Sequence, residues 1–142
     1  MSDHHRRLER MYLSAPVNDL YSPAIEVSEG AAVVTFEARR EHFHAAGSLH
    51  GSVYFKGLDD AAFFAVSSLV RDVFVLTASF TVYLTRPVTG GTLRAEGRVV
   101  SRSQSLFVAE AVLRVAPDRE VARGSGTFMR SRVPLSDVLG YR

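Results

Sequence analysis

The sequence predicts an α+β fold in which a curved antiparallel sheet of five to six strands wraps around one central helix, with a short helix at the N-terminus. Three observations lead to this fold class. Most of the chain alternates apolar and polar residues with the period of two that half-buried strands show. The stretch 51–70 is apolar on nearly every side, as a buried helix is. Residues 5–15 have the spacing of an amphipathic helix.

Length and composition exclude several classes of protein. With 142 residues, the chain fits one domain of about 100–200 residues, and we expect residues 1–142 to share one core. Its 46% hydrophobic residues exclude intrinsic disorder. A net charge of +2 is too small to indicate a nucleic-acid or membrane-surface partner. The absence of cysteine excludes a disulfide framework, a thiolate nucleophile and a cysteine zinc site.

The first 21 residues are expected to form a helical cover. Leu8, Met11, Tyr12 and Ala15 lie at helical spacing between a charged start and Pro16. Charged residues stand where a signal peptide needs its apolar stretch, and no window approaches about 18 uncharged apolar residues. We therefore expect a soluble, cytoplasmic protein.

The expected core, residues 23–130, is a meander of strands interrupted by the buried helix. Turn residues separate most of the strands, with the most distinct turns at Gly30, Gly90-Gly91 and Pro117-Asp118. The expected strands are 25–27, 32–39, 77–85, 93–99, 107–115 and 122–128. In the strand 77–85 we expect Ala78 and the apolar residues at every second position after it to share one face. Residues 131–142 are expected to be an irregular tail with Tyr141 as a docking residue.

Small residues on the expected helix and strands predict a close approach between them. The helix carries Gly57, Ala61, Ala62 and Ala65, and the facing strand positions are Ala95, Gly97, Gly124 and Gly126. Such residues leave room for a backbone to lie against another backbone. We expect all of them to bring the sheet close to the central helix.

The entry to the buried helix, His50-Gly51, is a candidate site for a developing negative charge. Gly51 has no side chain to shield the unpaired N–H groups of the first helical turn, which can point at a ligand oxygen. An oxyanion hole requires such donors. The structural interpretation is that Gly51 only permits a tight turn, and the sequence leaves both open.

Asp59 and Asp60 interrupt an otherwise apolar helix, and a buried carboxylate needs a partner. Lys56 stands three and four residues before them, so it could pair with one on a solvated rim, most simply with Asp60. Asp59 lies nine residues after His50, roughly 13 Å along a helix. That is too far for direct contact within one chain, whereas two antiparallel copies could bring Asp59 of one opposite His50-Gly51 of the other.

Three histidines lie close together in the sequence before the helix. His42 and His44 would share a face of an extended segment, and His50 could fold back toward them. This makes a metal site one interpretation. Against it, no carboxylate follows at a convincing spacing, and polar loop residues explain the cluster equally.

Several of these residues together resemble the hotdog-fold acyl-CoA thioesterases of the PaaI type. The resemblance covers residues 23–129, most of the chain. It is carried by His50-Gly51-Ser52, Leu58-Asp59 and Ala61, the strand 77–84 followed by Arg86-Pro87, the Gly90-Gly91 turn and the closing strand 124–128.

The resemblance implies an active site at a dimer interface. Asp59 would activate water or attack the thioester carbonyl directly, Thr77 would point its hydroxyl at that carboxylate, and His50 would orient the site. N–H groups near Gly51 and Ser52 would hold the oxyanion.

This sequence departs from the family at two positions. Ser52 replaces the usual second glycine after His50-Gly51. His44 replaces the usual Asn six residues before His50, where it could hold water, act as an acid or base, or be purely structural.

The candidate substrate-binding residues are Gly47, Asp60, Phe63, Arg86 and Arg102. All but one of the 17 Lys and Arg residues are arginine, which suits the phosphates of coenzyme A, although a general preference for arginine explains the count equally. Tyr54, Phe55, Phe63, Phe64 and the N-terminal helix would set the depth of the acyl pocket. We expect no cofactor beyond the CoA of the substrate, no metal, and no nucleic-acid or membrane partner.

A single sheet has two exposed edges, which predicts a homodimer or a dimer of dimers. Two further functions stay open. One is a hotdog protein that binds acyl-CoA or lipid without turnover, which the departures at Ser52 and His44 favour. The other is a hotdog enoyl-CoA hydratase or dehydratase, which also needs a histidine and a carboxylate across an interface.

Overall fold

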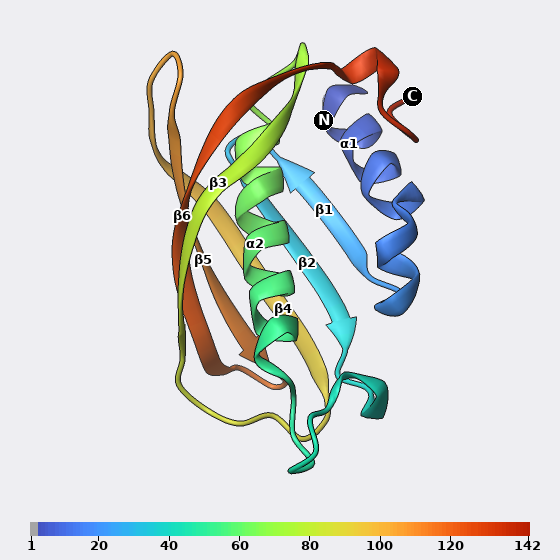
Figure 1. The fold of residues 1–142 in the computed structure, drawn as a ribbon, viewed down its shortest axis with the longest axis vertical. Helices are drawn as coiled ribbons and strands as arrows, with labels where there is room; N and C mark the ends of the chain where they lie inside the picture. The colour runs from blue at the N-terminus through green and yellow to red at the C-terminus, as the bar shows by residue number, and fades with distance from the viewer. Residues whose placement is uncertain (1–2) are drawn as a thin grey trace.

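A computed structural model describes residues 3–142 as a six-stranded antiparallel sheet curved around one long helix (Figure 1). The strands follow one another in space as β1-β2-β4-β5-β6-β3, so β1 and β3 are the sheet edges. This confirms the expected fold class. The central helix is α2 (Gly51–Ser67), and the strands are β1 (Ala24–Ser28), β2 (Ala31–Glu37), β3 (Val73–Leu84), β4 (Thr92–Arg102), β5 (Phe107–Val115) and β6 (Arg119–Pro134).

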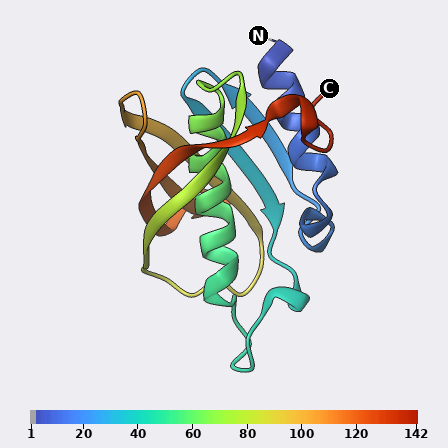
Figure 2. The same ribbon diagram turned by 45° about the horizontal axis from the view of Figure 1, so that its top comes forward.

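The N-terminal helix α1 (Asp3–Ser14) lies beside β1, and both chain ends come together on that side of the molecule (Figures 1 and 2). Leu8, Met11 and Tyr12 are buried, as the amphipathic spacing predicts. Three short 3-10 helices complete the chain: η1 (Pro16–Leu20), η2 (Arg40–His42) and η3 (Leu135–Asp137). Among residues 3–142, no helix combines the length and the apolar character needed to span a membrane.

Glycine lets α2 lie directly against β4. A Cβ atom on Gly97 would come within 2.4 Å of the carbonyl group of Ala61, a backbone contact that cannot give way. The prediction of close approach is therefore confirmed there. It is wrong for Gly124 and Gly126 of β6, where a Cβ atom would meet the Phe80 ring at 2.7 and 2.4 Å. These two glycines make room for an aromatic side chain of β3 rather than for the helix.

Strand β3 starts earlier than predicted and does not alternate strictly. Thr77 and Ser79 pair with successive residues of β6, which leaves Ala78 as an extra residue. A bulge of this kind reverses the alternation, so Thr77 and Phe80 both contact α2. Ala78 is exposed, so the prediction that it shares a face with Phe80 is wrong, because the bulge turns it outward.

Two element ends also differ from prediction. Helix α2 ends at Ser67 rather than at residue 70, and the hydroxyls of Ser67 and Ser68 donate back to the carbonyls of Phe63 and Ala65. Such side-chain bonds compete with the helical ones. Strand β6 continues to Pro134, which pairs with β3. The first residues of the expected tail are therefore part of the sheet.

Candidate active site

A cavity of about 350 Å³ opens between the N-terminal segment, α2, the first half of β3 and the C-terminal tail. This volume lies near the lower end of the range of about 300–1,000 Å³ for small-molecule sites. The lining is mostly apolar and aromatic, and two carboxylates of α2 interrupt it. The lining residues are Met11, Tyr12, Ala15, Pro16, Val17, Asn18, Lys56, Asp59, Asp60, Phe63, Phe64, Phe74, Thr77, Val138 and Leu139.

Of the two carboxylates in this cavity, Asp59 has no cationic side chain of residues 3–142 in direct contact, whereas Asp60 pairs with Lys56. Asp59 is half-buried, and its Oδ1 accepts a hydrogen bond of 2.8 Å from the Thr77 hydroxyl. Burial raises the pKa of Asp59 to about 6, while the bond from Thr77 acts in the opposite direction. The group is therefore ionised at neutral pH and basic enough to take a proton from a bound water molecule.

Asp60, the next residue, is held by three groups of the surrounding structure. Its Oδ2 accepts a hydrogen bond of 2.6 Å from the Tyr12 hydroxyl and forms an ion pair of 2.6 Å with Lys56 Nζ. Lys56 also donates to Asn18 Oδ1 at 2.6 Å. The pairing of Lys56 with Asp60 is as predicted, but the solvated rim is wrong because α1 covers the pair and leaves the Asp60 side chain 13% exposed.

The N-terminus of α2 faces a second hollow of about 320 Å³, which Gly51, His44 and Arg86 help to line. His50 caps the helix, since its Nδ1 accepts the Ser52 N–H at 3.0 Å. The Ser52 amide is therefore already bonded. Within residues 3–142 the Gly51 N–H has no acceptor, so it is the amide of this turn that is available to a ligand.

His44 and Gly47 belong to a tight turn beside this hollow. The His44 Nδ1 accepts the Ala46 N–H at 3.1 Å, so its Nε2 carries the proton and donates to Ser48 Oγ at 2.9 Å. Gly47 has a φ of +89°, a conformation that favours glycine. His44 thus stabilises the turn through its hydrogen bonds and also lines the second hollow.

The structure divides the predicted site residues into two sets within one chain. Asp59, Asp60, Phe63 and Thr77 line the first cavity. Gly51, His44 and Arg86 line the second, which His50 and Ser52 adjoin at the start of α2, and the exposed Arg102 lines neither.

His42, the third histidine of the metal hypothesis, is buried elsewhere. Its Nε2 donates to the Leu20 carbonyl at 2.9 Å, and its Nδ1 accepts the Arg39 N–H. Among residues 3–142 no three His, Cys, Asp or Glu side chains gather as a metal site would require. The three histidines instead hold local backbone and side-chain bonds.

Sequence reasoning gave no individual site role to several lining residues, among them Tyr12, Phe74, Val138 and Leu139. Tyr12 was expected only as an apolar position of α1, although a buried tyrosine needs a partner for its hydroxyl, which was an available signal. Phe74 lies in the part of β3 that was not predicted. For Val138 and Leu139 the sequence carries no signal, because their place depends on where the tail docks.

Residues 46–122, which contain Asp59 and Thr77, match the family model described as "Thioesterase superfamily". The chain belongs to the thioesterase superfamily. The match covers more than half of the sequence and includes lining residues of both hollows.

Solved structures place this thioesterase-superfamily chain in the hotdog fold. The PaaI protein of the phenylacetic acid degradation operon of Escherichia coli is 23% identical, with a TM-score of 0.82 over 94% of this chain and 99% of that one. A conserved protein of Pseudomonas aeruginosa is 26% identical, with a TM-score of 0.78 over 86% and 98%. A mutant of PaaI from Thermus thermophilus is 24% identical, with a TM-score of 0.74 over 82% and 100%.

These findings confirm the predicted resemblance to the PaaI-type hotdog proteins. The sequence has no significant match among curated proteins. The thioesterase superfamily is thus established as the family of this chain.

Proposed function

We propose that this protein hydrolyses an acyl-CoA thioester to the free acid and CoA, with Asp59 as the reacting carboxylate. The observation that carries the proposal is the environment of Asp59. It is half-buried in the wall of an apolar cavity, oriented by Thr77, with its pKa raised to about 6. An acyl group suits the apolar lining, and a base with this pKa suits proton transfer near neutral pH.

In the first of two mechanisms, Asp59 takes a proton from water while the water oxygen attacks the thioester carbon. The carbon–sulfur bond then breaks, and the thiolate of CoA leaves and takes up the proton. In the second, the Asp59 carboxylate attacks the thioester carbon, the carbon–sulfur bond breaks and the thiolate of CoA leaves and takes up a proton; water then hydrolyses the mixed anhydride at the Asp59 carbonyl, which frees the acid. A single turnover in H₂¹⁸O distinguishes them, because only direct attack puts the label into the Asp59 side chain.

The oxyanion needs donors, and the N-terminus of α2 supplies one. The free Gly51 N–H carries the partial positive charge of the helix terminus. Within one chain this amide is eight residues, roughly 12 Å, from Asp59 along the helix. We therefore propose that a second copy, with its α2 antiparallel, completes the site by bringing its own Asp59 toward Gly51.

The uncovered sheet edge supports this assembly. Strand β3 is an edge of the sheet and exposes Leu76, Tyr83 and Leu84. An exposed apolar edge strand pairs readily with another chain, and pairing of β3 with its own copy would give a symmetric dimer or a dimer of dimers. Arg86, beside the second hollow, would then lie where a phosphate of CoA can reach it.

The test is CoA release from a panel of acyl-CoAs of graded length, measured with wild type, Asp59→Asn and Asp60→Asn. We expect Asp59→Asn to abolish hydrolysis with the fold intact by circular dichroism. Asp60→Asn is the matched control, since it changes the neighbouring carboxylate and should reduce hydrolysis far less. The reverse ranking would contradict the assignment of Asp59.

Two other outcomes would select the alternative functions. Tight acyl-CoA binding without CoA release would indicate a binding protein. Water addition to an enoyl-CoA, seen as loss of its conjugated absorbance, would indicate a hydratase. Sedimentation velocity tests the assembly, because a monomer at assay concentration would leave Gly51 and Asp59 apart.

A further inference from the structure

We propose that the two chain ends together limit the length of the acyl chain, with Val17 and Leu139 as specificity-determining residues. We call the lining residues 15–18 and 138–139 the end wall. The inference rests on the proposed thioesterase function, because it takes the acyl group as the occupant of the cavity. It adds which residues decide how much of that group fits.

The end wall lines the same cavity as Asp59. Residues 15–18 come from η1 and the turn before it, and residues 138–139 come from the tail after η3. An acyl group whose carbonyl carbon lies beside Asp59 therefore extends into a space that both chain ends help to bound. With a volume of only about 350 Å³, the position of this wall has a direct effect on the size of group that fits.

The end wall exposes two large hydrophobic side chains. Val17 is 52% exposed and Leu139 is 61% exposed, although both contribute to the cavity lining. An apolar ligand that reaches them would remove part of this surface from water, which favours binding by about 25 cal/mol for each Å² of apolar area buried. A ligand too short to reach them gains none of this energy, so their side chains distinguish acyl groups by length.

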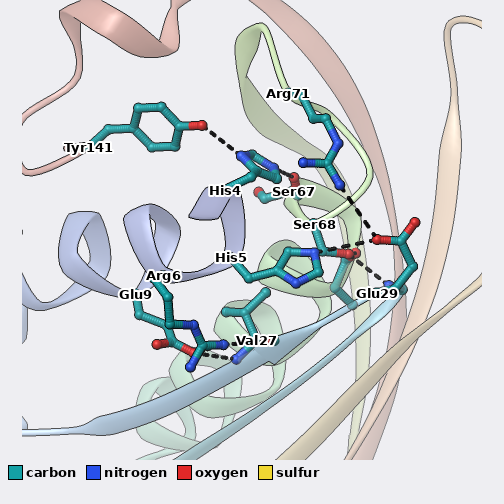
Figure 3. Close-up of polar contacts among 12 residues, drawn as sticks. His4, His5, Arg6, Glu9, Val27, Glu29, Ser67, Ser68, Arg71 and Tyr141 are labelled. Atoms are coloured by element: carbon teal, nitrogen blue, oxygen red, sulfur yellow. Dashed lines mark hydrogen bonds and ion pairs between the residues drawn. The ribbon is translucent and has the colours of Figure 1, made fainter. Parts of the chain in front are cut away.

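The C-terminal part of the wall is fastened to α1. His4 accepts a hydrogen bond of 2.6 Å from the Tyr141 hydroxyl at Nδ1 and donates one of 2.9 Å from Nε2 to the Ser67 carbonyl, so it links the tail, α1 and the end of α2 (Figure 3). Gly140 lies directly against Ser14, where no Cβ atom would fit. The Arg10 guanidinium also bonds the carbonyl of Arg142.

The N-terminal part of the wall is fastened to α2. Lys56 bonds Asn18 of η1 and Asp60 of α2, and Tyr12 of α1 bonds the same carboxylate. The Lys56 ammonium also lies 5.4 Å from the centre of the Tyr12 ring, a distance at which cation and ring attract. With both parts held by polar contacts, most of them partly buried, the wall has a defined position, which selection by length requires.

The end wall also lies outside the part of the chain that defines the family. The superfamily match covers residues 46–122, and both parts of the wall fall beyond it. Asp59, Thr77 and Gly51 fall inside it. The reacting groups and the length-limiting groups therefore come from different parts of the chain, and a change in the wall leaves the reacting groups in place.

The experiment compares kcat/KM across saturated acyl-CoAs from acetyl to palmitoyl for wild type, Val17→Trp and Leu139→Trp. The controls are Leu20→Trp in the same η1 and Leu13→Trp in α1, which replace similarly exposed leucines that do not line the cavity. We expect each wall variant to lower kcat/KM for the longest accepted acyl-CoA about ten-fold or more relative to acetyl-CoA. The two controls should keep the wild-type profile.

A second pair of variants tests the opposite direction. Val17→Ala and Leu139→Ala move the wall outward and remove the contact with an acyl group that just reaches it, so the acyl length with the highest kcat/KM should increase. The inference is overturned if wall and control variants share one profile, or if the wall variants instead change the oligomeric state, since a second copy would then cover the wall. If wild type releases no CoA from any substrate, the proposed function fails and this inference fails with it.

Discussion

Asp59→Asn should make the protein more stable at pH 8 while removing its proposed activity. The reason is the pKa of Asp59, which burial raises from an ordinary 3.8 to about 6. Well below pH 3.8 the carboxyl is protonated in both the folded and the unfolded chain, so ionisation has no effect on stability. Between about pH 4 and pH 6 the unfolded chain loses its proton first, and wild type becomes less stable as the pH rises.

The size of the effect follows from the two pKa values. Their difference is about 2 units, and each unit corresponds to about 1.4 kcal/mol, which sets an upper bound of about 3 kcal/mol. Asp59 is only half-buried, so solvent screening reduces the expected effect to about 1–2 kcal/mol. Asparagine does not titrate, and it can still accept the Thr77 hydrogen bond through its side-chain oxygen.

The assay is urea denaturation of wild type and Asp59→Asn at pH 4 and pH 8, with Asp72→Asn as an exposed control. The free energy of unfolding of Asp59→Asn should exceed that of wild type by about 1–2 kcal/mol more at pH 8 than at pH 4. The control should show no comparable change with pH. A difference between Asp59→Asn and wild type that is independent of pH would refute the reasoning.

Three further predictions concern the same residues and their supports. Thr77→Val removes a hydrogen bond that lowers the pKa of Asp59. The acid limb of the pH profile of kcat/KM, expected near pH 6, should therefore move to higher pH. A limb that stays in place would argue against Asp59 as the titrating base. Lys56→Met leaves the largely buried Asp60 without its cation and should lower the free energy of unfolding by about 2–4 kcal/mol. Adding Asp60→Asn to Lys56→Met should restore most of this loss. An equal loss in the double variant would contradict the pairing of Lys56 with Asp60. Gly97→Ala would place a Cβ atom 2.4 Å from the Ala61 backbone and should cost about 1–3 kcal/mol in urea denaturation, whereas a neutral result would mean that α2 shifts freely on the sheet.

Local patterns were sufficient to predict most of the fold. Alternation placed β2, β4 and β5 within a few residues, and the uninterrupted apolar stretch identified α2, because both signals depend on neighbours close in sequence. The Lys56–Asp60 pair was predictable for the same reason, since four residues bring side chains together on any helix. The bond from Thr77 to Asp59 was expected only through the family resemblance.

Features that depend on contacts distant in sequence were not predictable. The bulge at Ala78 arises from how β3 meets β6, and no residue type at that position marks it. Tyr12 and Asp60 are 48 residues apart, so neither identifies the other. Docking of the tail through Tyr141 was predicted, but its partner His4, 137 positions away, was not. Long-range contacts of this kind fix the cavity walls that α1 and the tail contribute. Local sequence patterns specify only the helix and the sheet that form the rest of the cavity.

The extra residue in β3 has a consequence for how this scaffold can change. Ahead of Ala78 the strand presents a hydroxyl to a carboxylate, and past it the strand inserts the Phe80 ring between two glycines of β6. The extra residue reverses which side chains of β3 face α2, so the part of the strand before Ala78 contacts the site and the part after it packs the core. Substitutions after Ala78 can therefore change the packing without changing the orientation of Thr77. Deletion of one residue at the bulge would instead exchange the inward-facing and outward-facing side chains in one part of β3.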